Sequence, residues 1–145
     1  MSTFVCQLNA ISRREIRLLR KLEAEVYPKA FRLGKTLLDD ADLALSICVM
    51  EDKRMAGYCI VERVSVDTVY IADIVRHPQA NVRAAQMLQM VLVEVQKDTR
   101  IKYITADCRQ TSLHLIRQFP VRILDEEPWW DDDREEQMVS FRLAI

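Results

Sequence analysis

One stretch in the middle of the chain has the residue pattern of an anion-binding loop between a strand and a helix. The strand-like run Tyr70–Val75 is followed by the loop Arg76–Ala80, and Asn81–Gln86 opens a long helical pattern. The first N–H groups of a helix have no intrahelical partner, so they are placed to bind phosphate. Phosphate loops commonly use glycine because the backbone must approach the ligand closely. The only glycines, Gly34 and Gly57, lie elsewhere, so the pattern predicts a phosphate site built without glycine.

A second segment concentrates negative charge. Positions 125 to 136 hold eight carboxylates and one base, a net charge of −7, whereas the rest of the chain holds 20 bases and 14 acids, a net charge of +6. This asymmetry argues against general nucleic-acid binding and predicts one local patch that attracts cations. A solvated acidic loop is the alternative. Trp129 and Trp130 lie in the segment, where they can supply cation–π contacts, an apolar wall or a protein-docking surface.

The composition predicts a single globular domain over residues 1–145. Half of the residues are hydrophobic and 30% are charged, and a chain of this length buries a core without metals or disulfides. No apolar run reaches the roughly 18–20 residues of a membrane span, and the first residues lack a signal-peptide pattern. These two absences predict no membrane contact. The four cysteines lie in strand-like runs without metal-like spacing, which predicts free thiols, no metal site and a cytoplasmic location.

Hydrophobic periodicity predicts an α/β fold in the order β-α-α-β-β-β-α-β-α-β-β. Strands are expected at Thr3–Leu8, Leu45–Met50, Met55–Val64, Val69–Val75, Ile101–Ala106, Val121–Leu124 and Met138–Ile145, the last with Val139, Phe141, Leu143 and Ile145 inward. Helices are expected after the capping box Ser12–Glu15, at Ala30–Asp40, at Val82–Lys97 and at Thr111–Phe119. The strand at Ile101 follows a helix, so it is expected to lie parallel to its predecessor in a mixed, mostly antiparallel sheet flanked by helices.

This order resembles the GNAT superfamily of acyl-CoA-dependent N-acetyltransferases, and the likeness covers nearly the whole chain. Leu45–Tyr58 is similar to the family's second and third strands, Ile74–Pro78 to its fourth strand with the following His-Pro, and Arg109–Val121 to its Asn-x-x-Ala-x-x-Leu-Tyr-x-x-x-Gly-Phe helix. The resemblance implies that the central strands splay apart and that acetyl-CoA, the co-substrate, lays its pantetheine arm in the gap. Backbone amides at the next helix start would hold its pyrophosphate.

The resemblance assigns the CoA site to the strand residues Ile74 and Val75 and to the following loop. The family pattern Arg/Gln-x-x-Gly-x-Gly/Ala falls on Asn81, Val82, Arg83, Ala84, Ala85 and Gln86. Ala84 adds one methyl group and Gln86 a long side chain where the family has glycine. Arg83 is expected to compensate with a charge-assisted contact to phosphate.

The later helix departs from the family pattern as well. The Tyr that commonly protonates the leaving CoA thiolate corresponds to Ile116, which cannot donate a proton, and the Gly-Phe pair corresponds to Pro120-Val121. Two interpretations follow. The chain is an acetyltransferase that uses other groups, or it has kept the fold and lost the chemistry.

Amine acetylation requires a polarised carbonyl, a deprotonated amine and correct positioning. Asp73, on the strand bordering the gap, is the predicted general base, and an Asp on the solvent side of the strand is the alternative. Asp107, which ends the next strand, has the same two interpretations. Cys108 and Tyr103 are the candidates for the acid that protonates the leaving thiolate.

The acidic segment lies beside the acceptor entrance in the arrangement that the resemblance implies. Trp129, Trp130 and Asp131 are therefore the predicted acceptor-binding residues. Carboxylates there would concentrate a cationic amine, such as a polyamine, a lysine or a basic N-terminus.

Two functions remain open. The first is an acetyl-CoA-dependent N-acetyltransferase that transfers an acyl group to the amine of a cationic acceptor or basic peptide. The alternative is a catalytically degenerate GNAT-like module that binds a protein partner through its acidic Trp-Trp segment, for which a homodimer is one arrangement. The enzyme is favoured because the family tolerates variation in its catalytic residues. Nucleic-acid binding is disfavoured because the basic first helix has no interleaved aromatic residues.

Overall fold

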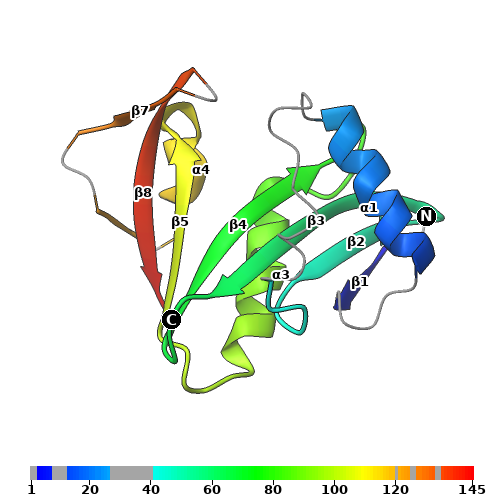
Figure 1. Ribbon diagram of the computed structural model, residues 1–145, viewed down its shortest axis with the longest axis horizontal. Helices are drawn as coiled ribbons and strands as arrows, with labels where there is room; N and C mark the ends of the chain where they lie inside the picture. The colour runs from blue at the N-terminus through cyan, green and yellow to red at the C-terminus, as the bar shows by residue number, and fades with distance from the viewer. Residues whose placement is uncertain (1–2, 8–12, 27–40, 120, 125–126, 133–134) are drawn as a thin grey trace.

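The computed structural model describes residues 3–7, 13–26, 41–119, 121–124, 127–132 and 135–145 (Figure 1). The described helices and strands are β1 (Thr3–Gln7), α1 (Arg13–Val26), β2 (Ile47–Glu51), β3 (Arg54–Arg63), β4 (Thr68–Arg76), α3 (Ala84–Gln96), β5 (Tyr103–Arg109), the 3-10 turn η3 (Gln110–Ser112), α4 (Leu113–Ile116), β6 (Val121–Ile123), β7 (Trp129–Asp131) and β8 (Glu136–Ala144). The predicted helix at Ala30–Asp40 and the predicted cap at Ser12 lie outside the described residues.

The described strands form one eight-stranded sheet in the order β1-β2-β3-β4-β5-β8-β6, with β7 paired to β8. Every pairing is antiparallel except that of β4 with β5. The chain crosses from β4 to β5 through α3, and such a crossover is what lets two consecutive strands run parallel. The predicted mixed, mostly antiparallel sheet is confirmed.

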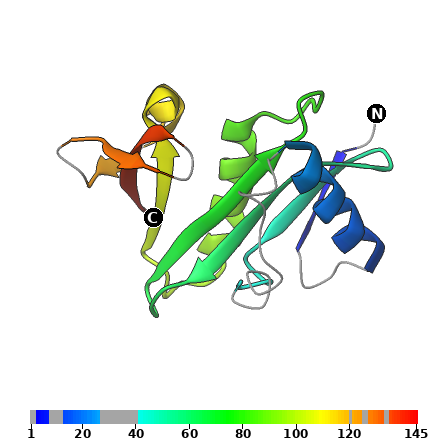
Figure 2. The same ribbon diagram turned by 45° about the horizontal axis from the view of Figure 1, so that its top comes forward.

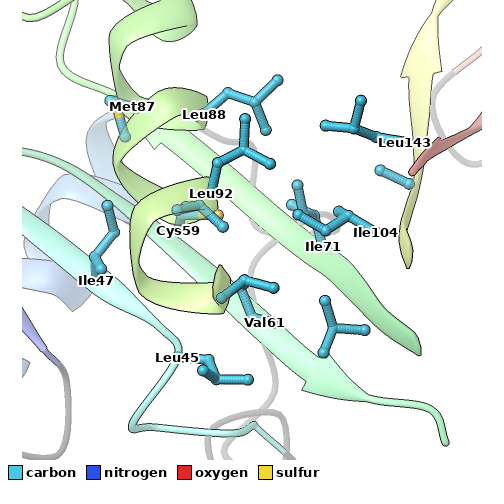
Figure 3. Packing of buried hydrophobic residues seen from close by; sticks show 14 of the residues in the cluster. Leu45, Ile47, Cys59, Val61, Ile71, Met87, Leu88, Leu92, Ile104 and Leu143 are labelled. Atoms are coloured by element: carbon cyan, nitrogen blue, oxygen red, sulfur yellow. The ribbon is translucent and has the colours of Figure 1, made fainter. Parts of the chain in front are cut away.

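The helices α1 and α3 cover opposite faces of the sheet (Figure 2). The apolar stripe of α1 packs on one face through Leu19 and Leu22, next to Tyr58 and Val75. On the other face, α3 buries a helically spaced row against β2 to β5 and β8 (Figure 3). This row is Met87, Leu88, Val91, Leu92 and Val95. Burial of each such side chain stabilises the fold by about 1.5–3 kcal/mol, so both helices hold the central strands in place.

The strands β4 and β5 pair over a short distance and then diverge. Their partners are Thr68 with Tyr103, Val69 with Ile104 and Tyr70 with Thr105, and the register includes no later pair. Figure 1 shows the two strands meeting near the C-terminus and separating along their length. Beyond Tyr70 and Thr105, β4 and β5 are therefore not hydrogen-bonded to each other, and the sheet opens into a V.

A bulge in β4 contributes to this divergence. On β3, the adjacent residues Ile60 and Val61 lie opposite Asp73 and Ile71, so Ala72 is an extra residue on β4. A bulge bends its strand and increases the local twist. It also changes which side chains share a face beyond that point.

Gly57 on β3 permits a close approach of β4 and α3. A Cβ atom at this position would lie 2.7 Å from the carbonyl oxygen of Val75 and 2.8 Å from Cε of Met87. Gly57 thus has a packing role, because the backbone of β4 cannot move aside as a flexible side chain can.

The structure differs from the sequence prediction near the C-terminus. The short strand β7 lies inside the acidic segment, where we predicted no strand. Its two Trp side chains are exposed, so the segment lacks the alternation that marks a half-buried strand. The inward placement of Ile145 is wrong: it follows the last β8 pair, Ala144 with Tyr103, and is exposed. Val139, Phe141 and Leu143 are buried as predicted.

Candidate active site

The gap between β4 and β5 contains a cavity of about 500 Å³, a size typical of small-molecule sites. Its walls come from β4 (Tyr70–Ile74), β5 (Ala106–Arg109), the first turns of α3 (Ala84, Ala85 and Leu88), and Trp129, Asp131, Met138 and Phe141 on β7 and β8. Val26, Ile116 and Phe119 complete the lining. The cavity thus lies where the two strands lose contact, with the start of α3 on one side and part of the acidic segment on the other.

Asp73 is a buried carboxylate on the wall of this cavity. Its side chain is 8% exposed and accepts a hydrogen bond of 3.1 Å from the hydroxyl of the fully buried Tyr58. The alternative that Asp73 lies on the solvent side of its strand is wrong. A carboxylate that opens into a cavity and is oriented by a neutral donor is suited to accept a proton.

Asp107 lies at the centre of a hydrogen-bonded network across the gap. It accepts a bond of 2.9 Å from the Tyr70 hydroxyl and one of 2.6 Å from the Ser140 hydroxyl. The indole N–H of Trp129 donates to the Ser140 hydroxyl oxygen at 3.3 Å. The register explains this arrangement, because Asp107 lies directly opposite Ser140 and two residues beyond the partner of Tyr70. The network connects β4, β5, β8 and β7.

Tyr70 is a site residue that we did not predict. It lines the cavity, and its hydroxyl is held by Asp107. The sequence identified it only as the start of a strand. Its role depends on the parallel register of β4 and β5, which hydrophobic periodicity does not specify.

The loop before α3 satisfies its first N–H groups with side chains of the same chain. The N–H of Asn81 donates to both carboxylate oxygens of Glu51, at 3.0 and 3.1 Å, and the N–H of Val82 donates to Glu51 Oε2 at 3.2 Å. The N–H of Arg83 donates to Oε1 of Gln86 at 2.8 Å. Gln86 therefore folds back onto the helix start as a cap instead of projecting in front of it. Glu51 was not predicted as a site residue.

The next three N–H groups of α3 are those of Ala84, Ala85 and Gln86. Within the described part of the chain, these N–H groups donate no hydrogen bond to a carbonyl oxygen outside the helix, as is usual in the first turn of a helix. The N–H of Met87 makes the first intrahelical bond, to the carbonyl oxygen of Arg83. The anion site predicted from the sequence is thus divided into an internally satisfied part and an open part.

The predicted CoA-site residues fall into three groups. Those that line the cavity are Ile74, Ala84 and Ala85. Those buried in the core are Val75 and Val82. Those exposed at the start of α3 are Asn81, Arg83 and Gln86.

The two candidate proton donors are not brought together. Cys108 lines the cavity and is half-buried. Burial, and then the charge of Asp107, raise the pKa of its thiol, which makes it a weaker acid than an ordinary cysteine. Tyr103 lies at the closed end of the V, where its ring stacks under the Arg142 guanidinium at 4.5 Å, and it is not part of the lining.

Two of the three predicted acceptor residues reach the cavity. Trp129 and Asp131 line it, whereas Trp130 is 52% exposed and lies outside the lining. Among the described residues no cluster of potential metal ligands occurs, and no helix is long and apolar enough to cross a membrane.

Comparison with known proteins identifies the fold. No family model and no curated protein matches the chain in sequence. Among solved structures, the ribosomal-protein-S18-alanine N-acetyltransferase from Escherichia coli superposes with a TM-score of 0.77 at 14% identity, covering 99% of this chain and 94% of that chain. Arabidopsis thaliana Naa50, in complex with the bisubstrate analogue CoA-Ac-MVNAL, gives 0.76 at 14% identity and covers 100% of each chain. The chain has the GNAT fold.

A third similar structure has its co-substrate in place. The GNAT family acetyltransferase from Elizabethkingia anophelis with acetyl-CoA bound superposes with a TM-score of 0.70 at 15% identity, covering 99% of this chain and 98% of that chain. The predicted resemblance is confirmed at the level of the GNAT fold.

Proposed function

We propose that this protein is an acetyl-CoA-dependent N-acetyltransferase that transfers an acyl group to the amine of a cationic acceptor. The observation that carries the proposal is the cavity in the β4–β5 gap with the buried carboxylate of Asp73 on its wall. Burying a carboxylate costs desolvation free energy, so a buried carboxylate on the wall of a cavity is a candidate functional group. The hydroxyl of Tyr58 donates a hydrogen bond to the Asp73 carboxylate.

The residues around the gap fit acetyl-CoA, the acyl donor. The open N–H groups of Ala84, Ala85 and Gln86 would hold pyrophosphate, and the apolar part of the lining, such as Leu88 and Phe141, would contact the pantetheine arm. When bound, acetyl-CoA supplies an activated acetyl carbonyl and a thiolate leaving group. Ala72, the extra residue of the bulge, lines the cavity and is the candidate backbone group to polarise that carbonyl.

The residues of the chain then complete the transfer. Asp73 takes a proton from the acceptor ammonium, and the free amine attacks the acetyl carbonyl, so that a C–N bond forms and the C–S bond breaks. The nitrogen then loses its second proton, which passes through the Tyr70 hydroxyl or a water molecule to the CoA thiolate, so that CoA thiol leaves and Tyr70 keeps its proton. Of the two predicted donors, Tyr103 lies outside the cavity lining, and the raised pKa of the Cys108 thiol makes it a weaker acid.

The acceptor side is supported by charge. Trp129 and Asp131 line the cavity from β7, and the segment from 125 to 136 carries a net charge of −7. A polyamine, a lysine side chain or a basic N-terminus would be concentrated there and oriented by the indole face.

Thermal unfolding with and without acetyl-CoA is the first test. At about 100 times its dissociation constant, a ligand stabilises the folded state by about 2.7 kcal/mol, which raises Tm by about 5–10 °C in a domain of this size. Release of CoA thiol is then followed with spermidine, lysine and a basic peptide, with an acidic peptide as the matched control. We expect release only with the cationic amines. Absence of both the Tm shift and thiol release would reject the enzyme.

A second candidate function is a protein-binding module that has lost catalysis. It is favoured by the exposure of Trp130 in an acidic segment and by Ile116 in place of a proton-donating Tyr. In that case acetyl-CoA leaves Tm unchanged, whereas a basic peptide quenches Trp fluorescence in the wild type and binds at least tenfold more weakly to the Trp130→Ala variant.

A further inference from the structure

Glu51 is a buried carboxylate that ends β2 and faces the loop before α3. Its side chain is 3% exposed, and its two oxygens accept three hydrogen bonds, at 3.0, 3.1 and 3.2 Å, from the N–H groups of Asn81 and Val82. Among the described residues no Lys, Arg or His forms an ion pair with it. Its negative charge is therefore balanced by backbone N–H groups and by the positive end of α3.

The Glu51 carboxylate therefore lies close to the place where the pyrophosphate of a CoA thioester would bind. The N–H groups of Asn81, Val82 and Arg83 are satisfied by Glu51 and Gln86. A phosphate group on the next three N–H groups, those of Ala84 to Gln86, would lie within about one helical turn, or 5.4 Å, of them. The carboxylate of Glu51 would thus oppose its charge at short range.

We propose that Glu51 is a specificity-determining residue of the donor site, which makes the protein select thioesters through their pantetheine arm more than through their pyrophosphate. The inference rests on the proposed function, because it concerns the same cavity. Glu51 occupies two N–H groups that could otherwise bind the phosphates of acetyl-CoA, and its charge repels those phosphates. Gln86 occupies a third N–H group. Neither side chain affects the apolar, strand-lined part of the cavity, which would contact the uncharged pantetheine arm.

The expected effect follows from the charges. Two unit charges about 7 Å apart at a partly exposed site repel enough to change an affinity by roughly tenfold. Neutralising Glu51 should therefore strengthen binding of acetyl-CoA by about tenfold and leave binding of acetyl-pantetheine, which carries no phosphate, unchanged. A general disturbance of the loop would instead weaken both ligands together.

The test compares the dissociation constants of two ligands among the wild type and three variants. Dissociation constants for acetyl-CoA and acetyl-pantetheine are measured with the wild type, Glu51→Gln, Gln86→Ala and the control Asp52→Asn, which removes an exposed charge from the same hairpin. We expect the affinity ratio of the two ligands to rise about tenfold in Glu51→Gln and about threefold in Gln86→Ala, and to stay unchanged in Asp52→Asn. Because Gln86 is exposed, its variant keeps the test valid if Glu51→Gln does not fold.

Inorganic pyrophosphate separates this inference from the proposed function. Stabilisation of Glu51→Gln by pyrophosphate at concentrations that leave the wild-type Tm unchanged would support the inference even if no amine is acetylated. An unchanged or reduced ligand ratio in Glu51→Gln and Gln86→Ala would overturn it, whether or not the wild type acetylates amines. Failure of every variant to bind acetyl-CoA and pyrophosphate would also overturn it.

Discussion

Replacing Asp73 by Asn tests the proposed chemistry at one position. Asp73 is 8% exposed, and its carboxylate accepts a hydrogen bond of 3.1 Å from the Tyr58 hydroxyl. Asn has nearly the same shape, and its carbonyl oxygen can accept the same bond, so the free energy of unfolding should fall by only about 1 kcal/mol. The amide cannot accept a proton. General-base catalysis contributes about 10²–10⁴-fold, so kcat should fall at least about a hundredfold, equivalent to about 2.7 kcal/mol in the barrier.

The assay measures CoA thiol release at saturating acetyl-CoA, with Tm and the dissociation constant of acetyl-CoA measured on the same preparation. The matched control is Asp107→Asn, which alters the other carboxylate lining the cavity. A second control, Tyr58→Phe, removes the hydroxyl that donates to Asp73 and leaves the carboxylate in place. We expect the Asp73 variant to lose at least about a hundredfold in kcat while keeping its affinity for acetyl-CoA, and both control variants, which only orient other groups, to lose less than about tenfold.

Two results would refute this reasoning. An Asp73→Asn variant that retains more than a tenth of the wild-type kcat would show that Asp73 is not the base. A hundredfold loss in Asp107→Asn, with Asp73→Asn active, would move the base to β5 and to the network that includes Tyr70.

Three further outcomes concern stability and reactivity. Gly57→Ala should destabilise the fold by about 1–3 kcal/mol, because its Cβ atom would lie 2.7 Å from a backbone oxygen of β4; an unchanged urea midpoint would contradict this. The raised pKa of Cys108, caused by burial and then by Asp107, should make alkylation by iodoacetamide at pH 7 slower than in the unfolded chain, and Asp107→Asn should accelerate it, as peptide mass spectrometry would show. Hydrogen bonds from Arg100 lower the pKa of Asp98, so Asp98 stabilises the fold above its ordinary pKa of 3.8 and stops doing so as the pH falls through the lowered value. The Tm difference between the wild type and Asp98→Asn should accordingly shrink below about pH 4 and persist at pH 7.

The elements with strong periodicity were predictable from the sequence. The α3 helix repeats apolar residues at helical spacing and buries them, and β8 alternates buried and less buried residues up to Leu143. The parallel placement of β5 followed from the helix before it. The sequence prediction missed the strand β7 and the exposure of Ile145 because neither follows from the local hydrophobic pattern. The strand β7 forms by pairing with β8, and Ile145 is exposed because the β5–β8 pairing ends at Ala144.

The site was less predictable because it depends on a bulge and on contacts between distant residues. Tyr70 and Asp73 are three positions apart, so simple alternation would place them on opposite faces of β4. The extra residue Ala72 reverses the alternation. Val75, which alternates with Asp73, accordingly packs in the α1 cluster, whereas Ile71 packs in the α3 cluster and leaves Tyr70 on the α1 face. Periodicity alone could not show that Tyr70 and Asp73 share the cavity.

The missing glycines and the internal caps at the start of α3 are best explained as one feature. An N–H group that is buried without a partner costs about 1–3 kcal/mol, so a loop that no longer gives all of its N–H groups to an external anion must satisfy them otherwise. Glu51 lies 30 residues before Asn81 in the sequence, and Gln86 lies three residues after Arg83, yet together they take every N–H from Asn81 to Arg83. The same Gln86 stands where the resemblance places a glycine, so the residue that obstructs a close approach of phosphate is also one that satisfies the loop without it. A donor site altered in this way still has a lined cavity of about 500 Å³ for an uncharged arm. The strength of pantetheine binding, more than that of phosphate binding, should therefore decide whether acetyl transfer is retained.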